Sequence, residues 1–213
     1  MTTGAEPPTS LRERKKQQTR ARISGAATML FLERGFDRVT VAEVAEAAEV
    51  STMTVFNYFP RKEDLFLDRI PEAVALLEHA VRERPAGTSP VAAMHRLLLD
   101  LLAAGHPLVA VRDDFSYFWQ VVLDAPALRA RAREGVEEIE HALAAAVAET
   151  SDDPQPRLTA AMAVAAYRTV YVTTAERILA GESAAALAGE QRALLDGVFT
   201  ALETACAELR RGG

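Results

Sequence analysis

The stretch Thr40–Leu65, TVAEVAEAAEVSTMTVFNYFPRKEDL, contains two short segments in which apolar residues recur at helical spacing. Thr40 and Ser51 precede these segments, and a side-chain oxygen at such a position can accept hydrogen bonds from the free amides of a first helical turn. The stretch then ends on an aromatic run, Pro60 and two cations. Two short helices joined by a tight turn are the pattern of a helix-turn-helix motif.

The second of these segments separates apolar from polar residues when it is drawn as a helix. At about 100° per residue, Val55 and Phe59 fall on one side, and Met53, Thr54 and Asn57 fall on the other. A helix held by that apolar pair would present its small polar residues to the major groove of DNA. We therefore predict that Met53, Thr54 and Asn57 read bases, with Asn57 suited to a paired donor and acceptor contact with adenine.

The edges of the same motif carry groups that suit DNA phosphates. Thr52 and Tyr58 have hydroxyl groups, Thr40 begins the preceding helix, and Lys62 brings a charge. The basic residues of segment 12–22, Arg20 among them, would add a salt-dependent attraction that is independent of sequence. Short helix-turn-helix units also occur in proteins that do not touch DNA, so the motif alone leaves both interpretations open.

Composition and charge are consistent with a folded, soluble protein that has a small DNA-binding part. The 213 residues are 49% hydrophobic and 25% charged, with a net charge of −6. Residues 1–62 hold ten Lys or Arg against seven Asp or Glu, whereas residues 63–213 hold fourteen against twenty-three. A mildly basic N-terminal segment followed by an acidic C-terminal segment is typical of a small DNA-binding domain joined to a larger domain.

The rest of the sequence bears on the compartment. The one cysteine, Cys206, excludes an intramolecular disulfide and fits a reducing environment. The first twenty residues have no signal-peptide core, and no apolar run approaches the roughly 20 residues of a membrane span. We expect a cytoplasmic protein without a membrane partner.

Every segment with a clear apolar period has the period of a helix, and no alternating strand pattern appears. We predict an all-α fold of about nine helices. One of these is expected to begin after Pro60 and run to about Arg84, with a bend at Pro71, and another should span about 108–123. The expected domains are a disordered tail (1–10), a helix-turn-helix DNA-binding domain (11–62) and a ligand-binding and dimerisation domain (63–213).

Four motifs together resemble the TetR family of bacterial transcriptional regulators: Gly35-Phe36, the Thr40-Val-Ala-Glu-Val-Ala segment, Val50-Ser51, and the run Val55–Leu65. The resemblance covers roughly residues 19–66. It implies a three-helix head, a six-helix regulatory body and a homodimer. It also implies a double-stranded DNA operator that is released when a small-molecule effector binds the body. The predicted function is thus a ligand-responsive regulator, a repressor by family habit, that needs no cofactor.

Two positions depart from the family's pattern. Glu49 occupies a turn position that is usually glycine, and a left-handed backbone there would cost roughly 1 kcal/mol. Phe56 stands where the family often has a tyrosine that donates to phosphate, so the resemblance adds Phe56 to the predicted phosphate contacts.

The C-terminal part offers candidates for an effector site and for a dimer interface. The segment Asp113–Gln120 holds four aromatic residues, which either line a cavity for an apolar or aromatic ligand or form plain core. The residues expected near such a pocket are Met94, Leu98, His106, Phe115, Phe118, Trp119, Val122, Met162, Tyr167 and Arg168. Small residues on the last two helices favour a twofold four-helix contact. The residues expected in it are Leu158, Ala161, Ala165, Val172, Leu195, Phe199, Leu202 and Cys206.

Two other classes of function compete with a DNA-binding regulator. An enzyme is not expected, because the sequence has no phosphate-cradling glycine loop and no nucleophile motif. Glu138 and His141 form one half of a helical di-iron motif, but no other histidine supplies the second half, so no metal site is expected. The remaining alternative is a helical small-molecule-binding or adaptor protein that does not bind operator DNA.

Overall fold

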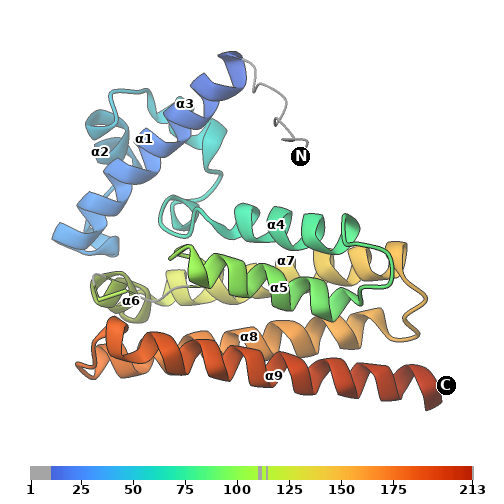
Figure 1. The fold of residues 1–213 in the computed structure, drawn as a ribbon. Helices are drawn as coiled ribbons and strands as arrows, with labels where there is room; N and C mark the ends of the chain where they lie inside the picture. Colours follow the sequence, from blue (N-terminus) through green and yellow to red (C-terminus); the bar gives the residue numbers. More distant parts are fainter. Residues whose placement is uncertain (1–10, 110–111, 114, 213) are drawn as a thin grey trace. The chain divides into compact units, whose positions relative to one another are not determined.

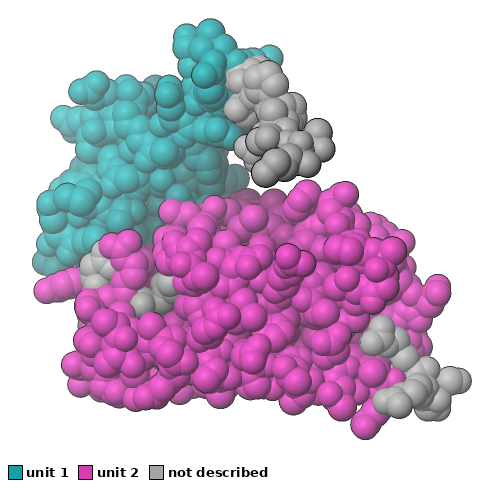
Figure 2. Space-filling model, viewed as in Figure 1, with its two compact units in different colours: residues 1–68 teal, residues 69–213 magenta. Residues whose placement is uncertain are grey.

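The computed structural model describes residues 11–109, 112–113 and 115–212. Within these ranges the chain forms nine α-helices, two short 3-10 helices and no strand, which confirms the all-α prediction (Figure 1). The chain divides into two compact units, Met1–Asp68 and Arg69–Gly213, which are called the head and the body (Figure 2). The predicted tail, residues 1–10, lies outside the described residues.

The head contains the first three α-helices and both 3-10 helices. Its elements are α1 (Leu11–Arg34), η1 (Phe36–Arg38), α2 (Val41–Ala47), α3 (Thr52–Tyr58) and η2 (Glu63–Leu65).

Apolar residues from all of these elements fill the head's core. Phe31 of α1 is fully buried, and its ring lies 5.0 Å from that of Phe36 and 5.7 Å from that of Phe66. Val44 of α2 and Val55 of α3 are buried as well. The helix-turn-helix therefore packs on the C-terminal half of α1.

Local hydrogen bonds define where α2 and α3 begin. The Thr40 side chain accepts from the Glu43 amide while the Glu43 carboxylate accepts from the Thr40 amide, a reciprocal capping box. Ser51 caps α3 by accepting from the Thr54 amide. Glu49, between the two helices, has φ 52°, so the turn holds a glutamate in the left-handed conformation that suits glycine.

The prediction of one bent helix from Pro60 to Arg84 is wrong. Leu65 and Phe66 turn into the head's core around η2, and α4 begins later, at Ile70. Pro71 lies in the first turn of α4, where the missing amide costs no hydrogen bond, so the proline starts this helix instead of bending it. The two units meet between Asp68 and Arg69, whereas the sequence placed the division after Lys62.

The body is a bundle of six α-helices. They are α4 (Ile70–Arg82), α5 (Pro90–Ala103), α6 (Phe115–Asp124), α7 (Pro126–Thr150), α8 (Pro156–Leu179) and α9 (Ala184–Gly212). α7 packs against α4 and α8, and α9 runs alongside α8 and also contacts α5 (Figure 1). None of the described helices is both long and apolar enough to span a bilayer.

The helix expected over 108–123 begins instead at Phe115. The carbonyl of Leu108 accepts a hydrogen bond from the Tyr167 hydroxyl, and the carbonyl of Val109 accepts one from the buried Gln191 amide, 2.8 Å away. Side chains of α8 and α9 thus take up backbone acceptors that a helix would have used.

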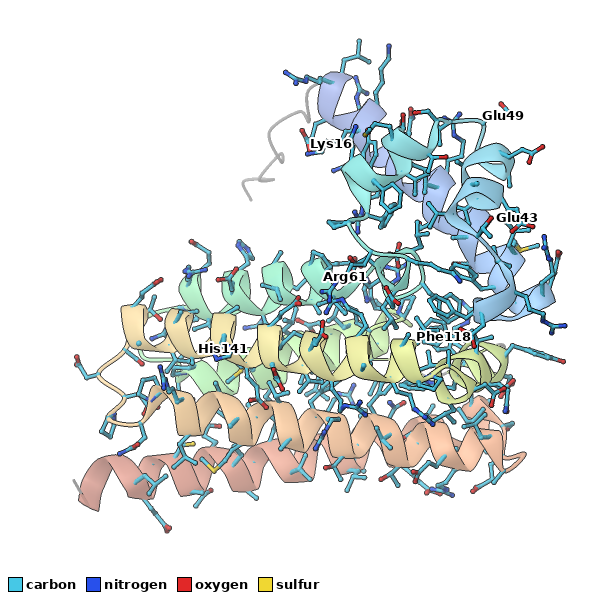
Figure 3. The ribbon with its side chains drawn as sticks, turned by 180° about the vertical axis from the view of Figure 1, so that it is seen from behind. Lys16, Glu43, Glu49, Arg61, Phe118 and His141 are labelled. Atoms are coloured by element: carbon cyan, nitrogen blue, oxygen red, sulfur yellow. The ribbon has the colours of Figure 1, made fainter. Side chains whose placement is uncertain are left out.

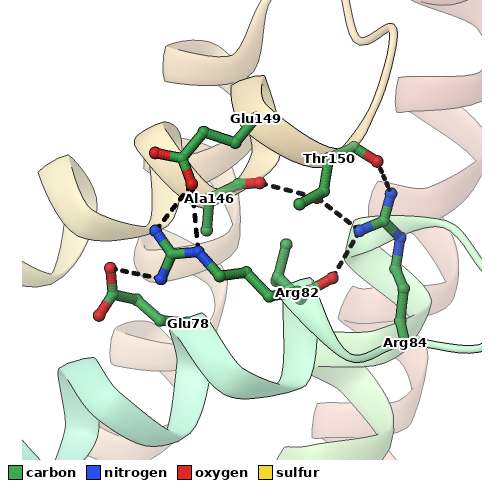
Figure 4. Close-up of polar contacts among 7 residues, drawn as sticks. Glu78, Arg82, Arg84, Ala146, Glu149 and Thr150 are labelled. Carbon is green, nitrogen blue, oxygen red and sulfur yellow. Dashed lines mark hydrogen bonds and ion pairs between the residues drawn. The ribbon is translucent and has the colours of Figure 1, made fainter.

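Two arginines join the C-terminal ends of α4 and α7 (Figure 4). The Arg84 guanidinium donates to the carbonyls of Val81 and Thr150 and to the Thr150 hydroxyl. Arg82 pairs with Glu149 at 2.9 Å. Helix ends leave carbonyls without partners, and Arg84 satisfies one at each of these two ends.

Candidate nucleic-acid interface

The short helix α3 presents the face that the sequence predicted for it. Val55 and Phe59 are each 1% exposed, so they anchor the helix to the head. On the opposite side Met53 is 70% exposed and Asn57 is also exposed. Thr54 is half-buried, and its hydroxyl lies 2.8 Å from that of Ser51. The three predicted base-reading residues therefore belong to one outward surface.

Arg20 fixes the C-terminal end of α3. Its guanidinium donates to the carbonyls of Tyr58 and Asp68, both at 3.0 Å, and lies 4.2 Å from the centre of the Phe59 ring. Helix carbonyls at a C-terminus lack partners within the helix, and a cation there is favoured. The structure thus gives this predicted phosphate contact an internal role.

Lys62 is also engaged inside the head. Its ammonium group donates to the Phe36 carbonyl at 2.6 Å and lies 4.2 Å from the centre of the Phe36 ring. Partial burial lowers the pKa of Lys62, and the carboxylate of Asp37 opposes that change. Lys62 therefore holds η1 against the segment that follows α3.

Glu43, in the first turn of α2, has a carboxylate whose pKa is strongly lowered. Hydrogen bonds from the Thr40 amide, from Arg34 and from the Thr40 hydroxyl lower the pKa of Glu43 to about 2. The Arg34 and Glu43 side chains approach to 2.6 Å. Thr40 is exposed, but its hydroxyl already donates to Glu43 at 2.8 Å.

Comparison with known proteins places this head in a family. The family model for bacterial regulatory proteins of the tetR family matches residues 23–68. The HTH-type transcriptional regulator TcmR of Streptomyces glaucescens is 32% identical over 168 residues, which cover 75% of this chain and 74% of that protein. The chain belongs to the tetR family. It is a DNA-binding transcriptional regulator.

Solved structures of tetR-family regulators share the fold. A putative TetR-family regulator from Mesorhizobium loti MAFF303099 superimposes with a TM-score of 0.53, at 16% identity over 88% of this chain and 98% of that one. NalD, the secondary repressor of the MexAB-OprM multidrug efflux pump in Pseudomonas aeruginosa, gives a TM-score of 0.53 at 19% identity, over 86% and 96%.

The other phosphate candidates of this tetR-family head lie along α3. Thr52, the first residue of the helix, is exposed. Tyr58, at its last position, is half-buried. Phe56 is 46% exposed and has no polar atom in its side chain, so it can meet DNA only by apolar contact.

In the body, the predicted pocket residues come from several helices. Most take part in packing: Met94, Leu98, Met162 and Tyr167 belong to the main core, and Phe115 and Trp119 pack on a second cluster that includes Ile178 and Leu187. Val122 is 2% exposed, whereas Arg168 is exposed.

His106 and Phe118 complete that predicted set. The Nε2 of His106 lies 3.3 Å from the Glu72 carboxylate, and its Nδ1 accepts from the Leu108 amide. The ring of Phe118 lies 5.4 Å from Phe115 and 5.9 Å from Trp119.

Tyr171 extends this aromatic group and was missed in the sequence, although it lies one helical turn after Tyr167. The Tyr171 ring lies 5.7 Å from Trp119 and 5.8 Å from Tyr167. Burial raises the pKa of Tyr171 to about 12 and raises that of Tyr167 further. The Trp119 indole nitrogen is buried, and its interaction with the Tyr171 hydroxyl partly offsets the rise in the pKa of Tyr171.

Two cavities of the body are lined by other residues. One, of about 230 Å³, lies between α8 and α9 and is lined by Thr173, Arg177, Leu187 and Gln191 among others. The second, of about 300 Å³, lies where the segment 84–88 meets Thr150. Neither includes a residue of the predicted pocket.

The predicted dimer residues fall on two different faces. On α8, Leu158 is 42% and Val172 is 38% exposed, Ala165 is exposed, and Ala161 is half-buried. On α9, in contrast, the four predicted residues are buried within one protomer: Leu195, Phe199, Leu202 and Cys206. Both faces of α9 carry apolar residues, and the four predicted residues belong to its core face. Leu194, which is 44% exposed, lies on the outer face instead.

The internal role of Arg20 has a signal in the sequence. Arg20 precedes Ile23 by three residues and Ala27 by seven, so it lies on the core side of α1. Lys62 had no local signal, because its partner Phe36 is 26 residues away.

Proposed function

We propose that this tetR-family chain is a ligand-responsive repressor that binds a near-palindromic operator as a homodimer. The observation that carries the DNA-binding part is the outward face of α3, where Met53 and Asn57 are exposed while Val55 and Phe59 anchor the helix. An asparagine on an exposed helix can make a paired contact with adenine, and Thr52 can donate to a phosphate.

The homodimer is supported by the outer face of α8 and α9. Exposed apolar side chains at Leu158, Val172 and Leu194 lie on two long helices that run together. A twofold contact through this face would remove them from water. Two copies of α3 would then read half-sites about 34–36 Å apart, one turn of B-form DNA.

The effector site is proposed at the aromatic group of Phe115, Phe118, Trp119 and Tyr171. Aromatic side chains with few polar groups suit an apolar or aromatic ligand. The buried Trp119 N–H, which lies beside the Tyr171 hydroxyl, would donate to an oxygen or nitrogen of that ligand. The proteins of similar fold include one named as a repressor of a multidrug efflux pump, which agrees with control by a small molecule.

The DNA-binding part is tested by selecting duplexes from a random pool and measuring their affinity for the purified chain over a salt series. We expect selective binding that weakens with salt. Asn57→Ala should relax the preference at one or two base pairs, whereas Thr52→Ala should weaken all duplexes alike. A chain that selects no sequence, or two variants that lose selectivity equally, would refute the assignment.

The effector part has a direct optical readout, because Trp119 is the one tryptophan of the chain. Aromatic compounds are screened for release of the selected duplex, and each active compound is then titrated while tryptophan fluorescence is recorded. We expect release and fluorescence change at the same concentration. Release that leaves the Trp119 signal unchanged would place the effector elsewhere.

A further inference from the structure

The first two turns of α1 project beyond the core of the head. Every residue from Leu11 to Gln18 is exposed, and the first buried residue of the helix is Ile23. At 1.5 Å per residue, these eight residues extend for about 12 Å. A helical segment without packing contacts gains little stability from the rest of the fold. This segment, Leu11–Gln18, is called the projecting turns.

The projecting turns are strongly basic. They hold Arg12, Arg14, Lys15 and Lys16 against one acidic residue, Glu13. Cations near the start of a helix oppose its macrodipole, which favours anions at that end. Such a segment is stabilised when a polyanion lies against it, and the charge of duplex DNA has the complementary sign.

The contacts of Arg20 show which side of α1 lies next to α3. Arg20 holds the Tyr58 carbonyl at the end of α3, so this side of α1 faces the end of the reading helix. Lys16 and Arg12 lie one and two turns earlier, rotated by only about 40° and 80° from Arg20 around the helix. Figure 3 shows Lys16 on the projecting part of α1, near α3 and away from Glu49.

The other two cations of the segment point elsewhere. Arg14 and Lys15 are rotated by about 120° and 140° from Arg20. The chain therefore carries two pairs with equal charge on the same two turns, one on the side of α3 and one on the far side.

We propose that Arg12 and Lys16 bind phosphates of the duplex that flanks the bases read by α3. The projecting turns then form a second DNA contact of the head, outside the helix-turn-helix. This contact rests on the proposed binding of DNA by α3. It lengthens the stretch of duplex that each protomer holds and adds affinity without adding sequence information.

The two pairs provide a matched test. Arg12→Ala/Lys16→Ala and Arg14→Ala/Lys15→Ala remove the same charge from the same helix, and alanine keeps the helix propensity. Affinity of each variant for a duplex that the wild type selects from a random pool is measured by fluorescence anisotropy over a salt series. For the first pair we expect weaker binding, an unchanged base preference, and a salt slope reduced by about 1.8 per protomer, from two lost phosphate contacts.

Arg14→Ala/Lys15→Ala should reduce the salt slope by less than half of the amount expected for Arg12→Ala/Lys16→Ala. Equal losses from the two pairs would mean that only the overall charge of the segment matters, and would overturn the contact. Unchanged binding by the first pair would overturn it as well. Circular dichroism of both variants checks that their helix content is equal.

Shortening the selected duplex gives an independent readout. Removing flanking base pairs stepwise should weaken the wild type at a length that leaves Arg12→Ala/Lys16→Ala unaffected. If the two proteins lose affinity at the same length, the flanking contact does not exist. If the wild type selects no duplex, the proposed function itself is refuted. If the wild type selects a duplex that Arg12→Ala/Lys16→Ala binds equally well, only this inference is refuted.

Discussion

Arg20 of α1 donates a hydrogen bond to the carbonyl of Tyr58, the last residue of α3, at 3.0 Å. The same guanidinium donates to the carbonyl of Asp68, the last residue of the head. One side chain thus holds both the end of the reading helix and the end of the unit that contains it. Arg20 positions α3, and its planar fork suits two acceptors at once.

Replacing Arg20 by lysine should keep the charge and lose this geometry. A lysine ammonium cannot reproduce the fork, so we expect the α3 amides to lose roughly 2 kcal/mol of protection, the size of a hydrogen bond from a charged group. Native-state hydrogen exchange measures this directly.

The matched control for Arg20→Lys is Arg22→Lys, because Arg22 is exposed on the same helix. Operator affinity should fall for Arg20→Lys while the salt slope stays that of the wild type. A slope reduced by about one unit would mean that Arg20 binds phosphate after all.

The contrast between Arg20 and Val55 shows which features of the head the sequence pattern predicts and which it does not. The period of the apolar residues sufficed to place Val55 and Phe59 inside and Asn57 outside, because α3 is short and has one anchor face. The same period places Arg20 on the core side of α1, but it does not identify the partners of Arg20 and Lys62, which are backbone carbonyls 38 and 26 residues away.

The same limit explains the differences between sequence and structure in the body. Pro71 fits a kink and a first turn equally well in the sequence, and only the packing of Leu65 and Phe66 in the head decides for the first turn. On α9, apolar residues occupy both faces. The choice between Leu194 and Leu195 therefore depends on which face meets α5 and α8.

Glu49 should be a site where a single change stabilises the head. Its φ of 52° is costly for a residue with a Cβ atom, so Glu49→Gly is expected to add about 1 kcal/mol of protection to the amides of α2 and α3. Hydrogen exchange in the two helices provides the measurement.

Glu49→Gln separates strain from charge, because glutamine keeps the strained backbone and loses the carboxylate. It should leave the protection of both helices unchanged. An equal gain from glycine and glutamine would show that charge, and not conformation, is the cost at this position.

The capping box gives the head an acid-sensitive element. The pKa of Glu43 is lowered from 4.5 to about 2, so its ionised form is favoured in the folded state. The stability that this carboxylate contributes is complete above pH 4.5 and is lost as the pH falls toward 2. Protection of the α2 amides should therefore decrease over that interval.

Glu43→Gln removes the titration while it leaves an acceptor for the box. The difference in protection between wild type and Glu43→Gln should be constant above pH 4.5 and should shrink toward pH 2. Glu46→Gln, an exposed change on the same helix, serves as the control. A wild-type advantage that persists undiminished at pH 2 would contradict the assigned role.

The outer face of α8 and α9 is tested by placing a charge on it. Leu194→Glu puts a carboxylate on a side chain that is 44% exposed in one protomer, and a twofold contact would bury that charge without a partner. We expect sedimentation velocity to show a monomer at concentrations where the wild type is a dimer. Affinity for a two-half-site duplex should fall much more than affinity for a single half-site.

Leu123→Glu is the matched control, because Leu123 is 45% exposed on α6, a helix that does not contribute to the proposed contact. The same chemical change there should leave the dimer intact. If both variants remain dimeric, the interface does not include Leu194. If both dissociate, the effect reflects damage to the body instead of a contact on α8 and α9.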